Sequence, residues 1–170
     1  MNVVILGIVF LAGFCLGIIC FGNGCLKKIE QQRRFVEKYE SLFQLMCRWT
    51  KNIQEEQNIA EWFEKCDYRH IAIYGMGVVG RCMMRELEGS KIVIDYVIDL
   101  KEKCDMGSLT VYKPTDILPE VDCIIVTPIA NFDEIEDVLR LKLNCPIISL
   151  EDVIYVDDRC FDNKMNGELI

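Results

Sequence analysis

The hydrophobic pattern of this 170-residue chain changes character twice. Residues 3–22 (VVILGIVFLAGFCLGIICFG) contain no charged residue and no proline, so this run is apolar on every side. Residues 26–54 then repeat apolar positions every three or four residues, the period of an amphipathic helix. From residue 70 onward, short apolar runs alternate with helix-period segments. We therefore expect an apolar helix, an amphipathic helix and one α/β domain.

The apolar run is long enough to cross a bilayer, because twenty helical residues reach about 30 Å. A cleaved signal peptide needs a basic start and a shorter apolar core, and no Lys or Arg precedes this run. A lipoprotein signal needs small residues before its cysteine, but Phe14 precedes Cys15 and Ile19 precedes Cys20. We therefore predict an uncleaved, single-pass transmembrane anchor over residues 1–25.

The distribution of charge predicts how this anchor is oriented. The chain has a net charge of −8, which divides into +4 over residues 27–51 and −12 over residues 52–170. Because the basic residues follow the apolar run and none precedes it, the C-terminal domain is expected in the cytoplasm. The acidic domain would repel phosphodiester backbones, so we expect no nucleic acid as a partner.

Residues 26–57 are predicted to form a long amphipathic helix and a linker. The apolar stripe of this helix suits packing against the following domain or against a partner helix. It consists of Val36, Tyr39, Phe43, Met46 and Ile53, and is widened by Leu42 and Trp49. Within the apolar run, Gly13 and Gly17 are four residues apart, a spacing that lets two membrane helices approach closely. The sequence thus allows a homodimer.

The α/β domain is expected over residues 58–156, followed by a flexible tail over residues 157–170. Asn58, Asn131 and Ser149 are expected to cap helices. Apolar strands are expected at residues 71–74, 92–99, 108–112, 122–128 and 145–150. Their alternation with helices predicts a parallel sheet covered on both faces. The segment before the third strand is too short for a crossover helix, so we expect a trimmed Rossmann-like sheet with a short third strand at its edge.

A Gly-x-Gly-x-x-Gly motif follows the first expected strand and opens a helix, which is the context that such a motif requires. Gly75 would allow the tight turn, Gly77 would let a diphosphate approach the backbone, and Gly80 would let helix and strand pack closely. The free N–H groups expected here would favour an anion, and they belong to Met76, Gly77, Val78 and Val79. The motif predicts a nucleotide site, although an inherited fold without a ligand has the same pattern.

Further candidates lie where the other strands end. Asp99 follows Gly80 by nineteen residues and could accept hydrogen bonds from a ribose diol, which favours a nucleotide without a 2′-phosphate, although Lys101 and Lys103 would also allow a phosphate there. Thr127, Pro128 and Asn131 follow the fourth strand, at the same rim of the sheet. Each also has a purely structural interpretation, because Asp99 could cap a loop, Pro128 could end a strand and Asn131 could cap a helix.

Catalytic residues are not identified by the sequence. His70, the one histidine, precedes the first strand and is expected at the edge opposite the ligand rim. Cys82, two residues beyond Gly80, is better explained by core packing. The ten cysteines contain no C-x-x-C pair, so we expect no metal site. A Tyr-x-x-x-Lys pair, which drives short-chain dehydrogenase chemistry, is missing from the sequence.

Two segments, IAIYGMGVVGRCMMREL and YVIDLKEKCDMGSLTVYKPTDILPEVDCIIVTP, carry a resemblance to a known family. The chain from about residue 58 to residue 155 resembles the Rossmann-like nucleotide-sugar-binding domain of bacterial polysaccharide biosynthesis proteins. That family includes epimerase-like proteins and the N-terminal domain of sugar acyltransferases. The matching positions are Gly75, Gly77, Gly80, Asp99, Gly107 and Val111. The left-handed β-helix and the catalytic histidine of the acyltransferases are missing here, so the resemblance implies ligand binding without implying a reaction.

Together these features predict a membrane-anchored, cytoplasmic Rossmann-like module that binds a nucleotide-sugar or a dinucleotide such as NAD. The resemblance implies a role in cell-envelope polysaccharide biosynthesis, with a membrane glycosyltransferase as a partner. One alternative is an NAD-dependent oxidoreductase or epimerase-like enzyme. Another is a membrane-tethered interaction protein without catalytic activity, whose working parts are the amphipathic helix and the Gly13/Gly17 pair.

Overall fold

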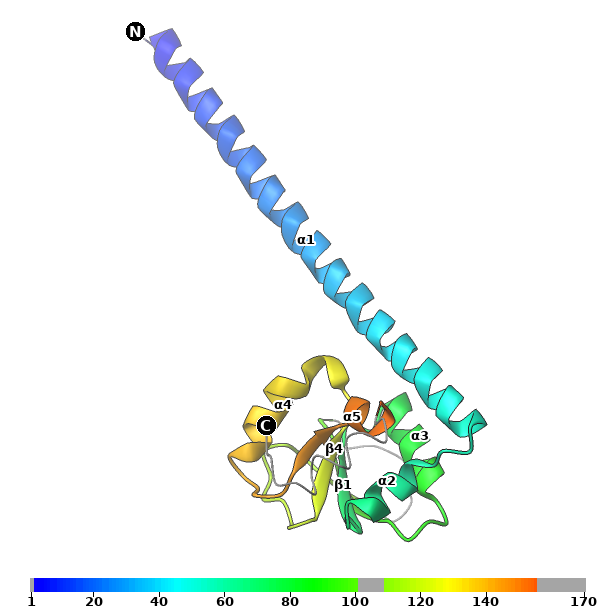
Figure 1. The fold of residues 1–170 in the computed structure, drawn as a ribbon. Helices are drawn as coiled ribbons and strands as arrows, with labels where there is room; N and C mark the ends of the chain where they lie inside the picture. The colour runs from blue at the N-terminus through cyan, green and yellow to red at the C-terminus, as the bar shows by residue number, and fades with distance from the viewer. Residues whose placement is uncertain (1, 101–108, 156–170) are drawn as a thin grey trace, which may run out of the picture. The chain divides into compact units, whose positions relative to one another are not determined.

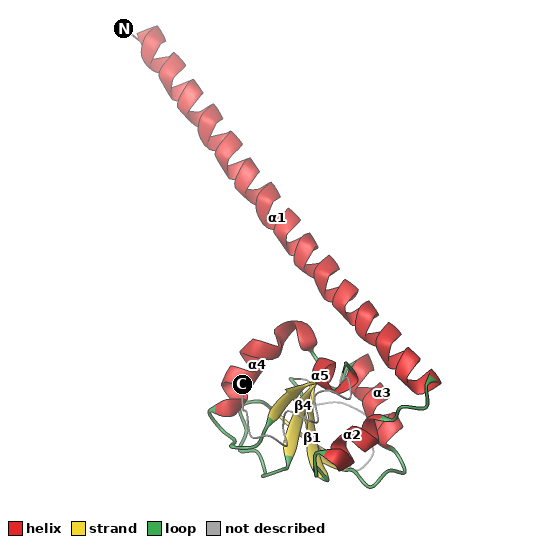
Figure 2. Cartoon of the chain, in the orientation of Figure 1, coloured by secondary structure: helices red, strands yellow, loops and turns green. Residues whose placement is uncertain are grey.

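The computed structural model describes residues 2–100 and 109–155. Within residues 2–24 it describes the backbone, and the surroundings of Gly7 and Gly13 alone. The chain divides into two units, Met1–Phe43 and Gln44–Ile170 (Figures 1 and 2). The first unit is part of one long helix. The second contains the end of that helix together with a parallel β-sheet and its covering helices.

Helix α1 (Asn2–Gln54) is continuous through both the apolar run and the amphipathic segment. Among the residues that the structure describes, no helix combines the length and the apolar character that crossing a membrane requires. The side chains of the apolar run 3–22 are not among the parts of the chain that the structure describes. The transmembrane anchor therefore stays a prediction.

The last three turns of α1 belong to the α/β unit and pack on it. Leu45 and Trp49 are at most 2% exposed, and the Asn52 side-chain amide donates to the carbonyl oxygen of Ile154 at 2.8 Å. The predicted apolar stripe is therefore docked in part, because Trp49 belongs to it, whereas Leu45 does not and Ile53 of the stripe is 56% exposed. In the first unit, three stripe residues are more than half exposed, namely Val36, Tyr39 and Phe43.

The sheet has five parallel strands in the order β3-β2-β1-β4-β5. They are β1 (His70–Tyr74), β2 (Val93–Ile98), β3 (Thr110–Tyr112), β4 (Cys123–Val126) and β5 (Ile147–Ser149). The predicted parallel α/β sheet is confirmed, and β3 is the short edge strand that was expected. This order matches the first five strands of doubly wound sheets that bind nucleotides, and it places β1 at the centre.

Helices cover both faces of this sheet (Figure 1). Helices α2 (Ile59–Lys65), α3 (Val78–Leu87) and α5 (Leu150–Ile154) lie on one face, whereas α4 (Phe132–Arg140) lies on the other. The core under α4 is built from alternate strand residues and Leu139 of the helix, and includes Ala72, Tyr96, Ile98, Ile124 and Val126. Asn58 and Ser149 cap α2 and α5 as predicted, because their side chains accept from Ala60 N and Glu151 N.

The connection from β3 to β4 takes the place of a crossover helix. Leu118 of this connection joins the core under α4 and is 8% exposed. The Tyr96 hydroxyl donates to the carbonyl oxygen of Pro119 at 2.7 Å, which fixes the connection against β2. A loop therefore makes this connection. Because β2, β1 and β4 are parallel neighbours, their carboxyl ends meet at one rim of the sheet.

Candidate functional site

The turn between β1 and α3 contains the three glycines of the motif. Gly75 has a φ of +88°, a conformation that residues with a Cβ adopt only with strain. A Cβ there would also lie 2.8 Å from Pro128 Cγ and 2.9 Å from Thr127 Oγ1. The Gly75 N–H donates to the carbonyl oxygen of Ile98 at 2.8 Å, which ties the turn to the end of β2. The first glycine is therefore required by backbone conformation and by packing.

The other two glycines differ from each other in their surroundings. A Cβ on Gly80 would lie 2.4 Å from the carbonyl oxygen of Gly75, so only glycine fits at this approach of helix to turn. A Cβ on Gly77 would meet nothing within 4 Å. Packing within the chain thus explains Gly80 and leaves Gly77 unexplained. The space beside Gly77 is the place where the motif predicts that a diphosphate approaches the backbone.

Helix α3 begins at this open position without a side-chain cap. Gly77 is its N-cap residue. The carbonyl oxygen of Gly77 accepts from the Arg81 N–H at 3.3 Å. The N–H groups of Val78 and Val79 have no acceptor within the helix, because the first turn of any α-helix leaves them without one. The positive end of the helix dipole adds to their attraction for an anion.

The N–H of Met76 differs from its neighbours in the turn. It donates to Asp99 Oδ2 at 2.8 Å, so the expectation of a free N–H at Met76 is wrong. The Met76 side chain is 2% exposed and packs under the turn. The N–H groups that the motif predicts for an anion are therefore limited to those that follow Met76, and the Asp99 carboxylate binds the N–H directly before them.

Asp99 lies at the end of β2, as the sequence predicts. Its own N–H donates to the carbonyl oxygen of Tyr112 at 3.0 Å, and this bond holds the residue at the rim between β1 and β3. Burial, and secondarily the negative charge of Asp99, raises the pKa of the Tyr74 hydroxyl above its usual value. The Asp99 carboxylate thus acts on both the last residue of β1 and the turn that follows.

Arg81 is a functional candidate that the sequence reading missed. Its guanidinium donates to the carbonyl oxygen of Met76 at 3.1 Å, which brings a positive charge back to the glycine turn from the first turn of α3. A cation at this position can pair with a phosphate. The sequence feature that could have indicated it is a basic residue directly after Gly80. Because α3 begins at Val78, this residue lies in the first turn of the helix, next to the glycine turn.

The predicted residues after β4 support the turn. Thr127 is 6% exposed, and its hydroxyl lies 2.6 Å from the carbonyl oxygen of Gly75 and 3.2 Å from that of Tyr74. Pro128 packs against Gly75, as its distance to a Cβ there shows. Asn131 is the N-cap residue of α4 but makes no side-chain cap bond. Contact of these residues with a ligand stays a prediction.

Asn131 fails as a side-chain cap for a local reason. Its φ and ψ are −124° and 22°, whereas a capping side chain requires an extended backbone. The short 3-10 helix η1 (Ile129–Asn131) precedes α4, and the Asn131 N–H donates to the carbonyl oxygen of Pro128 at 2.9 Å. The chain therefore turns into α4 through backbone hydrogen bonds, and the side chain of Asn131 is not needed to start the helix.

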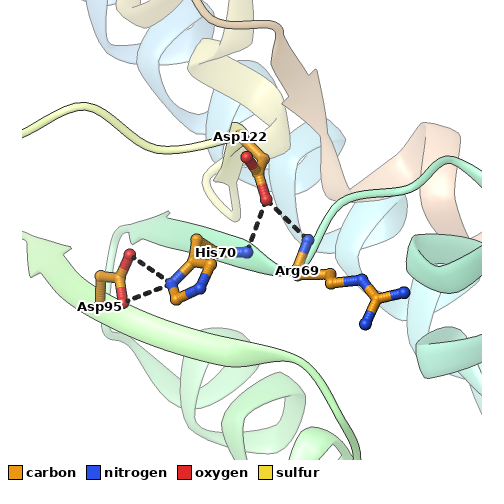
Figure 3. A network of polar contacts seen from close by, with 4 residues as sticks. All are labelled: Arg69, His70, Asp95 and Asp122. Atoms are coloured by element: carbon orange, nitrogen blue, oxygen red, sulfur yellow. Dashed lines mark hydrogen bonds and ion pairs between the residues drawn. The ribbon is translucent and has the colours of Figure 1, made fainter.

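A separate polar network lies at the amino ends of the strands (Figure 3). His70 Nδ1 contacts both carboxylate oxygens of Asp95 at 3.1 Å. Asp122 Oδ2 accepts from the N–H groups of His70 and Arg69 at 2.7 and 2.8 Å, and these bonds lower the pKa of Asp122. His70 begins β1, whereas the glycine turn follows the end of β1. The network therefore joins three strand starts, at the edge opposite the glycine turn.

A cavity of about 550 Å³ lies between the end of α1, the start of α2 and the side of α3. Its lining includes Trp49, Cys82 and Glu86. The Glu86 carboxylate accepts from the indole N–H of Trp49 and, at 3.2 Å, from the N–H of Ile59, which begins α2. Cys82 thus faces α1 rather than the glycine turn. Within the described ranges, no cluster of three His, Cys, Asp or Glu side chains could hold a metal ion.

Comparison of this chain with protein-family models, with curated proteins and with solved structures finds no match.

Proposed function

We propose that the α/β unit binds a nucleoside diphosphate group at the turn between β1 and α3. The diphosphate would lie beside Gly77, against the N–H groups of Val78 and Val79, and the ribose diol would donate to Asp99. A nucleotide-sugar and NAD both contain this group, and a ribose without a 2′-phosphate suits a carboxylate at the end of β2.

One observation carries this proposal. Gly77 has open space where a Cβ would stand, at the uncapped start of α3, and Asp99 is held beside it by the Met76 N–H at 2.8 Å. Gly75 and Gly80 are explained by the packing of the chain itself, whereas an open Gly77 is explained by the close approach of a ligand. Arg81 supports the same reading, because it adds a positive charge at the turn.

A nucleotide-sugar is the first choice of ligand. It follows from the resemblance of residues 58–155 to the nucleotide-sugar-binding domain of polysaccharide biosynthesis proteins, together with a membrane anchor at residues 1–25. A domain tethered at the inner leaflet would be concentrated beside the membrane glycosyltransferases that use such donors. An NAD-dependent oxidoreductase or epimerase-like enzyme is the alternative that shares the same turn and the same ribose contact.

A thermal-shift screen of the full chain in detergent with NAD, NADP and a UDP-sugar tests this proposal. A ligand at about 100 times its Kd stabilises a protein by about 2.7 kcal/mol, which raises the Tm by several degrees. We expect the UDP-sugar to raise the Tm and NADP to have no effect. A shift with NAD alone would favour the oxidoreductase. If none of the three ligands shifts the Tm, the remaining interpretation is the membrane-tethered interaction protein without catalytic activity.

A further inference from the structure

Helix α1 carries a row of exposed apolar side chains within the unit Met1–Phe43. We call this row the α1 seam, and it consists of Leu26, Ile29, Phe35, Val36, Tyr39 and Phe43. Each of these side chains is between 54% and 68% exposed. The rings of Phe35 and Tyr39 contact each other in a tilted arrangement, with centroids 4.5 Å apart. Six large apolar side chains on one stretch of helix mark an interaction surface rather than a solvated face.

Four of the six seam residues have the spacing of a coiled coil. Ile29, Val36 and Phe43 follow one another at intervals of seven residues, and Tyr39 lies three residues after Val36. These four are a and d positions of a heptad repeat, whose complement is a helix with the same repeat. Gln32 occupies the d position after Ile29, and Leu26 and Phe35 lie at the flanking e and g positions. A second copy of this chain supplies such a helix.

The area of the seam fits such a pair. A buried aromatic side chain covers about 150–250 Å², and the seam side chains are each more than half exposed. Covering the four side chains at a and d positions in each of two copies removes on the order of 1,000 Å² from water, near the lower limit for a specific interface. Lipid is a poorer partner for the seam. Helix α1 is continuous, so if residues 1–25 cross the bilayer, the turns that follow extend away from the membrane surface.

We propose that the α1 seam pairs with the seam of a second copy, in parallel and in register. The parallel direction rests on the proposed membrane anchor, since two anchored copies enter the cytoplasm from the same side. Flanking charges are satisfied within each helix, because Arg33 pairs with Glu37 at 2.9 Å and Arg34 pairs with Glu30 at 3.5 Å. Pairing would hold two ligand-binding domains together at the membrane.

Cys25 provides a native probe of this arrangement. It is exposed, and it precedes Tyr39 by fourteen residues, so it occupies the same d position of the heptad. In a parallel, in-register pair the two Cys25 thiols meet at one level and can form a disulfide. In an antiparallel pair centred on Val36 they would lie about 30 Å apart, because each residue adds 1.5 Å along the helix.

The experiment is oxidative cross-linking of the full chain in liposomes, with Cys15 and Cys20 replaced by serine. Copper phenanthroline takes up the two electrons as the two thiols lose their protons and join. We expect a cross-linked dimer that Cys25→Ser abolishes and that Cys47→Ser, the loss of an exposed thiol outside the a and d positions, leaves intact. A chain that stays monomeric, or a dimer that survives Cys25→Ser, would overturn the proposal.

A matched pair of variants locates the contact. Val36→Glu places a charge in the seam, whereas Ser41→Glu places the same charge five residues further on, on another side of the helix. We expect the yield of cross-linked dimer to fall about tenfold in Val36→Glu and to stay within twofold in Ser41→Glu. Equal yields in the two variants would place the contact elsewhere, for example at Gly13 and Gly17. Ligand-induced Tm shifts of both variants report separately on the proposed nucleotide site.

Discussion

The backbone N–H of Met76 donates to Asp99 Oδ2 at 2.8 Å, so the glycine turn after β1 is fastened to the end of β2. Asp99→Ala removes this acceptor and also the acceptor for a ribose diol. We predict that the variant binds a nucleotide-sugar about tenfold to a hundredfold more weakly, since a hydrogen bond to a charged group contributes about 1.5–3 kcal/mol. Isothermal titration calorimetry measures the loss.

Asp99→Asn separates the two roles of this side chain. The amide oxygen can still accept from Met76, but the negative charge is lost. We predict that this variant keeps the Tm of the wild-type protein better than Asp99→Ala does, while its affinity for the ligand still falls. Unchanged affinity in both variants would show that Asp99 does not bind the ribose.

Two glycine substitutions distinguish packing within the chain from space kept for a ligand. Gly80→Ala puts a Cβ 2.4 Å from the carbonyl oxygen of Gly75, and we predict a loss of stability of about 1–3 kcal/mol. Gly77→Ala meets no atom within 4 Å, so its unfolding free energy should stay close to that of the wild type. Chemical denaturation measures both, and comparable losses in the two variants would contradict the described turn.

Glu86 joins three helices through one carboxylate, which accepts from Trp49 on α1 and from Ile59 on α2. Glu86→Ala leaves two partly buried donors without an acceptor, so we predict a loss of about 2 kcal/mol or more and a red shift of tryptophan fluorescence. Glu88→Ala, an exposed change two residues away, is the control and should stay within about 0.5 kcal/mol. Equal Tm values for the two variants would show that the Glu86 contacts add no stability.

Asp122 makes stability depend on pH. Hydrogen bonds from the N–H groups of His70 and Arg69 lower its pKa in the folded protein. The stabilisation is therefore fully present above the unfolded-state pKa of about 3.9, and is lost as the pH falls through the lower folded-state pKa. We predict that Asp122→Ala costs about 1 kcal/mol at pH 7, a value reduced for its exposure, and less near pH 2. Denaturation at both pH values measures this difference. An equal loss of stability at both pH values would show that the ionised carboxylate of Asp122 is not the source of the stabilisation.

Local signals in the sequence were sufficient for much of the fold. The apolar runs that became β1 and β4, and the caps Asn58 and Ser149, depend on neighbours in the chain, and the structure has them where the pattern predicts them. The short segment before β3 correctly indicated an edge strand, because a crossover helix does not fit in so few residues. Such features are decided by spacing and by residue type.

Contacts between distant segments were not accessible in the same way. The bond from Met76 to Asp99 spans 23 residues, and neither residue type signals it. The docked face of α1 was predicted only in part, because Trp49 belonged to the predicted stripe whereas Leu45 did not, and only packing shows which apolar side chains meet the domain. Arg81 was missed because its reach back to Met76 depends on where α3 begins.

The most direct test of the central claim is calorimetric titration of UDP into the wild-type full chain and into Gly77→Ala. UDP contains the ribose and diphosphate that the turn is proposed to hold, together with a uracil base, and it lacks the sugar of the nucleotide-sugar. We predict that UDP binds the wild-type protein and that Gly77→Ala, with an unchanged Tm, weakens this binding at least tenfold. Absence of UDP binding to the wild-type protein, or equal affinity in the variant, would contradict a UDP-sugar site at this turn.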